Sequence, residues 1–198
     1  MALMNHGLFT FGETAKISYE LMIELVTRAE EYLARHNAWK IQLPPVPEPK
    51  RTARLEIATL RREASAVAGT PLILATHSDA QCLGFAQRGD VPDLSQRGAA
   101  TPDHVGRTKR VPLVGRDVQA YCRGYQRYFA THSAGRKLTM VDPAPRVILD
   151  RELGLCAIGR TAKEAVIAGD IYRHTIDIIL RAEALGGWRA LPAQDMFD

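Results

Sequence analysis

The side chains of this chain that could do chemistry are a few histidines, each beside a glycine, a hydroxyl or a carboxylate. His6 lies between Asn5 and Gly7, at the very start of the sequence. A glycine beside a histidine lets other backbone approach whatever the imidazole faces. Imidazole is the commonest metal ligand among side chains. We therefore take His6 as a candidate metal ligand. The alternative is a strand-end histidine that is hydrogen-bonded to backbone.

Three further histidines have a chemical and a structural interpretation. Asp103-His104 could be the remnant of a metal site, or a loop in which Pro102 and Asp103 form a turn. Residues 76–79 hold a hydroxyl, an imidazole and a carboxylate, but catalytic triads assemble in space and not from adjacent residues. A turn with Ser or Asp capping the next helix is the structural interpretation. His174 lies on an apolar helix face, which favours a packed, hydrogen-bonded histidine over a ligand.

A basic stretch runs from Arg97 to Arg127, with seven basic and two acidic residues. Tyr121 and Tyr125 lie within it and Tyr128 lies just after it, at the spacing of one helix face. One interpretation is a surface that binds the phosphate of a sugar phosphate. The other is a solvated helix face with the tyrosines packed against the core.

Composition excludes several classes of protein. The 198 residues are 46% hydrophobic and 24% charged, which is ordinary for a globular protein, and the net charge of +4 mixes both signs. We therefore expect no nucleic acid as partner. We also expect no membrane span, because no apolar run approaches the roughly 20 residues that a helix needs. The three cysteines, without C-x-x-C spacing, indicate buried thiols in a reducing cytoplasm.

Periodicity predicts the elements that must position these residues. Residues 2–4 and 8–11 are predicted as short buried strands, and residues 13–36 as an amphipathic helix. Four prolines within 44–49 predict a stiff, extended linker. Beyond it we expect helices at 52–68, 80–87, 118–131 and 161–185, strands at 72–75, 146–150 and 154–158, and a loop over 88–110.

An internal repeat links the two ends of the chain. Residues 7–16 align with residues 154–163 at an offset of 147, with six of ten positions identical. Each copy continues into a long predicted helix. His6 aligns with Leu153, so this scaffold of strand, glycine and helix does not require a histidine. A chemical role in the first copy is therefore favoured.

The motif around His6, with residues 9–12 and the helix that follows, resembles the last conserved segment of the class II aldolase/adducin family. There the histidine is the third of three that hold a catalytic zinc, so the resemblance implies His6 as a zinc ligand. The chain is similar over nearly its whole length to one branch, the bifunctional rhamnulose-1-phosphate aldolase/short-chain dehydrogenases. The segments that carry this likeness are 101–105, 108–115, 142–146 and 170–175.

The resemblance also implies that several functional segments of the parent protein lie outside residues 1–198. The other two zinc histidines, the catalytic acid and a glycine-rich phosphate loop would precede residue 1. The fingerprint that binds NAD would follow Asp198. We therefore expect Zn²⁺ in the complete parent protein and NAD in a further domain, with neither activity complete in this chain. Catalytic residues cannot be assigned within it.

These observations lead to one expectation for the fold and two for the function. We expect an α/β fold, a layered sheet with flanking helices. Residues 1–43 would be the end of one class II aldolase unit, 44–52 a linker, and 53–198 a degenerate second unit. The resemblance implies zinc-dependent cleavage of a ketose 1-phosphate, with a sugar phosphate as substrate and a homo-oligomer as assembly. The alternative is a non-catalytic structural or oligomerisation module between the aldolase and dehydrogenase domains.

Overall fold

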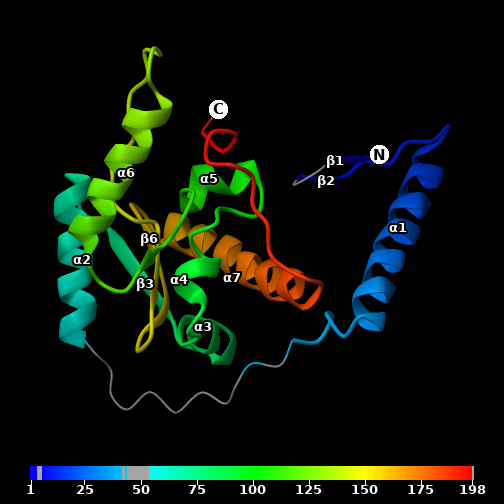
Figure 1. The fold of residues 1–198 in the computed structure, drawn as a ribbon, viewed down its shortest axis with the longest axis horizontal. Coiled ribbons are helices and arrows are strands. Elements are labelled where there is room, and N and C mark those ends of the chain that lie inside the picture. Colours follow the sequence, from blue (N-terminus) through cyan, green and yellow to red (C-terminus); the bar gives the residue numbers. More distant parts are fainter. Residues whose placement is uncertain (4–5, 42, 44–53, 198) are drawn as a thin grey trace.

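A computed structural model describes residues 1–3, 6–41, 43 and 54–197, so the predicted linker lies outside the described residues. The described residues form a mixed α/β fold, as predicted (Figure 1). The first part of the chain holds β1 (Ala2–Leu3), β2 (Gly7–Leu8) and α1 (Ala15–Arg35). The remaining elements are α2 (Arg54–Ala68), β3 (Ile73–His77), α3 (Ala80–Ala86), α4 (Val91–Leu94), α5 (Pro102–Thr108), β4 (Leu113–Val114), α6 (Val118–His132), β5 (Val147–Asp150), β6 (Gly154–Gly159) and α7 (Ala162–Ala184).

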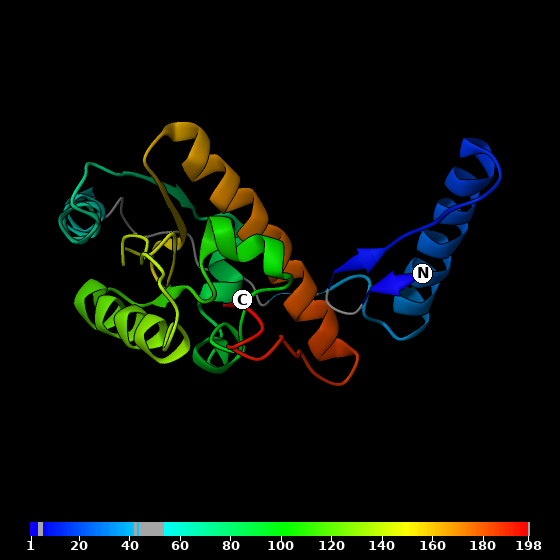
Figure 2. The same cartoon turned by 90° about the horizontal axis from the view of Figure 1, so that it is seen from above.

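A four-stranded sheet organises residues 54–197, in the order β3-β6-β5-β4. β6 pairs antiparallel with both neighbours, and β5 pairs parallel with β4. All six residues of β6 are buried. Leu155 joins a core that includes α3, α4 and α7, whereas Cys156 and Ile158 join a second core that includes α2 and Val118 of α6. The sheet is therefore a layer between two sets of helices (Figure 2).

The last helix begins as its sequence predicts. The Thr161 side chain accepts a hydrogen bond from the backbone of Glu164, at 3.2 Å. The Glu164 carboxylate in turn accepts from the backbone N–H of Arg160, one residue before the position in a standard capping box. Eight residues of α7 are buried, so tertiary packing holds this helix in place.

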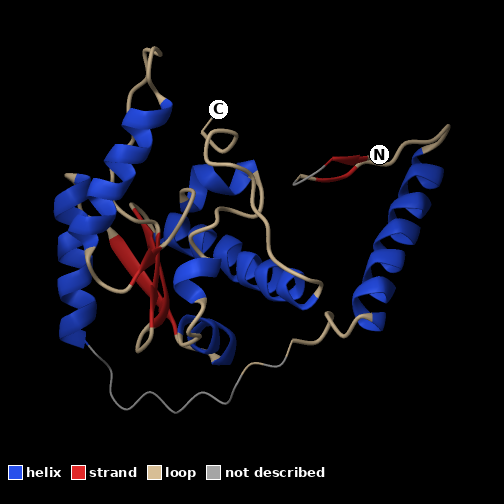
Figure 3. Ribbon diagram, viewed as in Figure 1, coloured by secondary structure: helices blue, strands red, loops and turns tan. Residues whose placement is uncertain are grey.

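The first part of the chain differs in burial from what we expected. α1, all of whose residues are described, has none buried, and both residues of β1 and of β2 are exposed. The prediction of buried strands at 2–4 and 8–11 is therefore wrong for the described positions. Figure 3 shows α1 standing apart from the helices around the larger sheet. The chain joins the body just after α1, where Ala38 is fully buried and Trp39 stacks on Arg181 at 4.5 Å.

The predicted loop over 88–110 is also partly wrong, because it contains α4 and α5. Both helices have a proline in their first turn, Pro92 and Pro102. A proline there lacks only an N–H that would have no helical partner, so it marks a helix start as well as a loop. His104 consequently lies on a helix and not in a turn.

Candidate functional site

His6 lies in the turn between β1 and β2, where the tip of the hairpin meets α5. Its Nδ1 is 3.7 Å from Oδ2 of Asp103, and the two side chains are 44% and 77% exposed. The ring stacks on Phe9 with 6.1 Å between centroids. The structure thus brings together two residues that the sequence places 97 positions apart. A long, exposed contact of this kind contributes little to stability, so it leaves His6 available for another partner.

His104 and His174 lie close to each other on the facing helices α5 and α7. Their ring centroids are 6.5 Å apart, and His104 Nδ1 lies 3.4 Å from the Thr175 hydroxyl. That hydroxyl also donates to the carbonyl of Ile171, at 3.0 Å. Desolvation, and then the neighbouring His174, lower the pKa of His104. His174 is exposed, so the expectation of a packed histidine there is wrong.

A catalytic zinc takes three protein ligands and leaves one position open. Among the described residues, no group of three or more histidine, cysteine, aspartate or glutamate side chains is placed to hold a metal. His6 offers one imidazole and Asp103 one nearby carboxylate. The described residues therefore do not form a complete zinc centre, and we derive no catalytic step through the metal.

Residues 76–79 perform the structural role that we considered for them. Asp79 caps α3, because its carboxylate accepts from the backbone of Gln81 and Cys82, and it also pairs with Arg173. Its pKa is lowered: burial opposes the shift, but the hydrogen bond and the charge of Arg173, together with the backbone hydrogen bond from Cys82, outweigh it. His77 lies in β3, with Nε2 buried beside Gly169 and without a hydrogen-bond partner among the described residues. Asp79 therefore serves Arg173 and the helix cap, and the four residues do not act as a triad.

The basic stretch from Arg97 to Arg127 contains paired, buried and exposed side chains. Arg97 pairs with Asp93 and Glu183, and Arg116 pairs with Asp150 and Glu152. Because these two arginines form ion pairs within the fold, the structural interpretation is favoured at their positions. The phosphate-binding surface stays a prediction for the others.

Lys109 is a group that the sequence analysis missed. It is 6% exposed, its backbone has a positive φ of 61°, and its ammonium lies 3.7 Å from the ring centre of Tyr125. The ammonium also donates to the backbone carbonyl of Asp142. Burial, and then the charge of Arg146, lower its pKa from 10.5 to about 7. Nothing next to Lys109 in the sequence distinguishes it from the six exposed or paired basic residues around it.

The three tyrosines line a pocket of about 210 Å³ on α6, together with Gln96, Arg110, Val111 and Gly124. Tyr121 donates to the carbonyl of Val111 and Tyr128 to that of Ala193, each at 3.1 Å. The guanidinium of Arg110 lies 5.5 Å from the Tyr128 ring. All three tyrosines are half-buried, and Tyr121 and Tyr128 are hydrogen-bonded to backbone, which fits a packed helix face.

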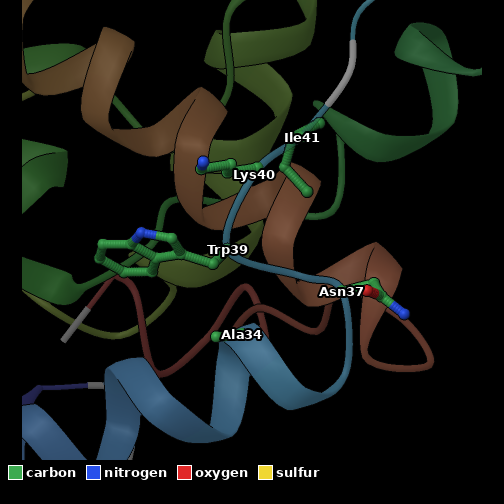
Figure 4. Close-up of a pocket in the computed structure, with 5 residues that line it drawn as sticks. All are labelled: Ala34, Asn37, Trp39, Lys40 and Ile41. Atoms are coloured by element: carbon green, nitrogen blue, oxygen red, sulfur yellow. The ribbon is translucent and has the colours of Figure 1, made fainter.

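A wider pocket of about 560 Å³ lies where the chain leaves α1 (Figure 4). It is lined by Ala34, Asn37, Trp39, Lys40 and Ile41. Figure 4 shows the amide of Asn37 and the ammonium of Lys40 pointing in opposite directions. Its polar groups therefore do not converge on a ligand, and we assign no chemistry to it.

Comparison with known proteins agrees with the resemblance in the sequence. Residues 51–198 match the family model "Aldolase class II, second domain". The chain is also 30% identical over 216 aligned positions to the "Uncharacterized oxidoreductase YuxG" of Bacillus subtilis (strain 168). That match covers 97% of this chain and 31% of the relative, so the chain spans about a third of the relative's length. No solved structure matches the chain.

Proposed function

Because the chain belongs to the class II aldolase family, we propose that it is part of a bifunctional aldolase/short-chain dehydrogenase. The aldolase portion would cleave a ketose 1-phosphate, rhamnulose 1-phosphate, to dihydroxyacetone phosphate and lactaldehyde. Two facts support a longer, two-activity polypeptide: the relative is named an oxidoreductase, and the chain spans about a third of it. NAD would bind in the dehydrogenase portion, outside these residues.

The observation that carries the proposal is the position of His6. Its imidazole is half-exposed at the end of a hairpin, directly before the glycine of the strand–glycine–helix motif. Zinc would supply a Lewis acid that polarises the substrate carbonyl. His6 would hold that zinc together with ligands from outside the described residues. Its counterpart in the second copy is Leu153, 6% exposed and packed in the core.

Within this proposal, residues 54–197 have a structural role. For these residues we thus adopt the alternative of a non-catalytic module between the aldolase and dehydrogenase domains. The carboxylate of Asp150, whose side chain is 9% exposed, is paired within the fold with Arg116 at 2.7 Å. Two cores fill both faces of the sheet. We propose that this unit carries the His6 segment and joins the aldolase to the dehydrogenase.

The assembly and the compartment are part of the same proposal. We propose a homo-oligomer, because the apolar side chains of Tyr19, Ile23 and Val26 are 41–67% exposed along one side of α1. A cytoplasmic location is supported by three free, buried thiols. None of the described helices is long and apolar enough to cross a membrane.

The test compares zinc content and retro-aldol activity of this chain with those of the longer polypeptide. We expect zinc and activity in the longer polypeptide, and neither in the chain alone. His6→Ala in the longer polypeptide should abolish both, whereas His104→Ala, which removes a histidine of residues 54–197, should preserve them. Full zinc content and activity in His6→Ala would refute the proposal. So would activity in the short chain.

A further inference from the structure

The hairpin and helix at the start of the chain expose an unusually large apolar surface. Phe9, Phe11 and Tyr32 are each at least 46% exposed, and Leu8 is 39% exposed. Leu21, 37% exposed, lies among them. A monomeric protein rarely leaves so many large apolar side chains in one stretch exposed to water. We therefore expect another structural element to pack on this surface. The structure itself contains a second hairpin and helix that shows how such packing is made.

This second hairpin and helix is β5–β6–α7, which repeats β1–β2–α1 in strand register. In the first hairpin Leu3 pairs with Gly7 and Ala2 with Leu8. In the second, Asp150 pairs with Gly154 and Leu149 with Leu155. All four positions agree at the offset of 147 residues that the sequence alignment gives. The repeat is therefore a repeat of backbone pairing as well as of sequence.

The turn from strand to helix is also the same in both copies. Thr14 and Thr161 each accept a hydrogen bond from the third residue of the following helix, at 3.2 Å. A Cβ on Gly12 would come within 2.7 Å of Ile17. A Cβ on Gly159 would come within 2.6 Å of Glu164, which is the aligned residue. Both glycines thus permit the same close approach of strand to helix.

The copies differ in what surrounds them. In the second copy, a Cβ on Gly154 would come within 2.4 Å of the carbonyl oxygen of His77, because β3 runs along that edge of β6. A Cβ on Gly7, the aligned residue, would have no described atom within 4 Å apart from its chain neighbours. The edge of β2 that corresponds to the edge held by β3 is therefore open in the described structure.

The helices show the same difference. The eight buried residues of α7 face the sheet and the helices beside it. Six of the eight aligned positions in α1 are apolar, and none of the eight is buried: Leu21, Met22, Leu25, Ala29, Tyr32 and Leu33. α1 therefore has the apolar face of a sheet-covering helix without a sheet beneath it.

We propose that residues 6–36 dock into a second sheet-and-helix unit built like residues 54–197. In the docked state a strand pairs with the open edge of β2, as β3 pairs with β6. The face of α1 that contains Leu21, Leu25 and Leu33 covers that sheet, as α7 covers its own. The proposal concerns packing alone and needs neither zinc nor a sugar. It shares with the proposed function only the longer polypeptide that supplies the unit.

A second copy of this chain is a poorer occupant than a separate unit. The sheet of residues 54–197 already has α7 on one face and α2 with α6 on the other. A copy of the chain therefore offers no uncovered sheet face. The Bacillus subtilis relative extends well beyond the matched region, because that region is 31% of its length, so it has room for a further unit.

The experiment measures thiol labelling in this chain and in the longer polypeptide. Leu21→Cys introduces a thiol on the face that should dock, and its counterpart Ala168 is buried. Thr27→Cys is the matched control, because Thr27 and its counterpart His174 are both exposed. The native cysteines are buried and will label slowly. Both new thiols should label rapidly in this chain. In the longer polypeptide, position 21 should label at least about tenfold more slowly, and position 27 should be unchanged.

Three results would overturn the proposal. Equal labelling at position 21 in both polypeptides would show that the face stays exposed. Slower labelling at both positions 21 and 27 would show that α1 is buried on a face that stays exposed in α7. Slowing at position 21 that grows with the concentration of this chain alone would identify a second copy as the occupant. Loss of zinc or retro-aldol activity with normal protection at position 21 would instead refute the proposed function and leave the docking intact.

Discussion

The two ends of this protein carry the same hairpin and helix in different surroundings. The second copy has a strand on each edge of β6 and eight buried residues in α7. The first copy has a strand on one edge of β2 and no buried residue in α1. Local geometry is nevertheless the same in both, down to the threonine caps. Short-range sequence signals therefore build this motif, and the neighbouring elements decide whether it is buried.

The same comparison separates scaffold from chemistry. The position before the strand is His6 in the first copy and Leu153 in the second. Leu153 is 6% exposed and packs in a core, whereas the His6 side chain is 44% exposed beside a carboxylate. An imidazole could not replace Leu153 without burying a polar group. The first copy is thus the one that can present a ligand.

The largest expected difference in stability is between substitutions at two aligned leucines, one in α7 and one in α1. Leu180 is 4% exposed in α7, and the aligned Leu33 is half-buried in α1. Leu180→Ala should lower the free energy of unfolding by about 2–5 kcal/mol, because it leaves a cavity in the core. Leu33→Ala should lower it by less than about 1 kcal/mol. Urea denaturation of this chain measures both. Equal losses would show that α1 is as well packed as α7.

A smaller difference is expected between the two strand glycines. Gly154 has a φ of 79° and faces the His77 carbonyl, whereas the space beside Gly7 is open. Gly154→Ala should destabilise the chain by about 1–3 kcal/mol, through strain and the collision with β3. Gly7→Ala should change the free energy of unfolding by less than about 0.5 kcal/mol. The thermal unfolding midpoints of the two variants provide the measurement, and a larger loss at Gly7 would contradict the open edge.

A pH effect should arise in residues 54–197 and not in the first copy. The folded state lowers the pKa of Lys109 from 10.5 to about 7. Between these values the unfolded chain holds a proton that the folded chain has released, so stability should rise as pH rises from about 7 to about 10.5. Lys109→Met should flatten this rise in urea midpoints. Lys16→Met, at a side chain that is 82% exposed in α1, should not. An unchanged slope in Lys109→Met would refute the burial of an ammonium there.

The sequence predicted the elements whose signals are local. The helices predicted from periodicity and the hairpin at 147–159 are found in the structure. Burial could not be predicted in the same way, because the apolar row of α1 looks like that of a packed helix whether or not a partner is present. The buried ammonium of Lys109 depends on Tyr125 and Asp142, which lie 16 and 33 residues further along the chain. The 3.7 Å approach of Asp103 to His6 likewise depends on tertiary structure, although the sequence singled out both residues.

Hydrogen exchange of the backbone amides tests most directly whether the two copies differ in packing as we describe. In this chain, amides of α7 should exchange only through large-scale unfolding, whereas amides of α1 should exchange through local opening. We expect α1 to exchange at least about a hundredfold faster than α7, measured peptide by peptide under the same conditions. Comparable protection in the two helices would contradict the account, because it would mean that α1 is already packed without the proposed unit.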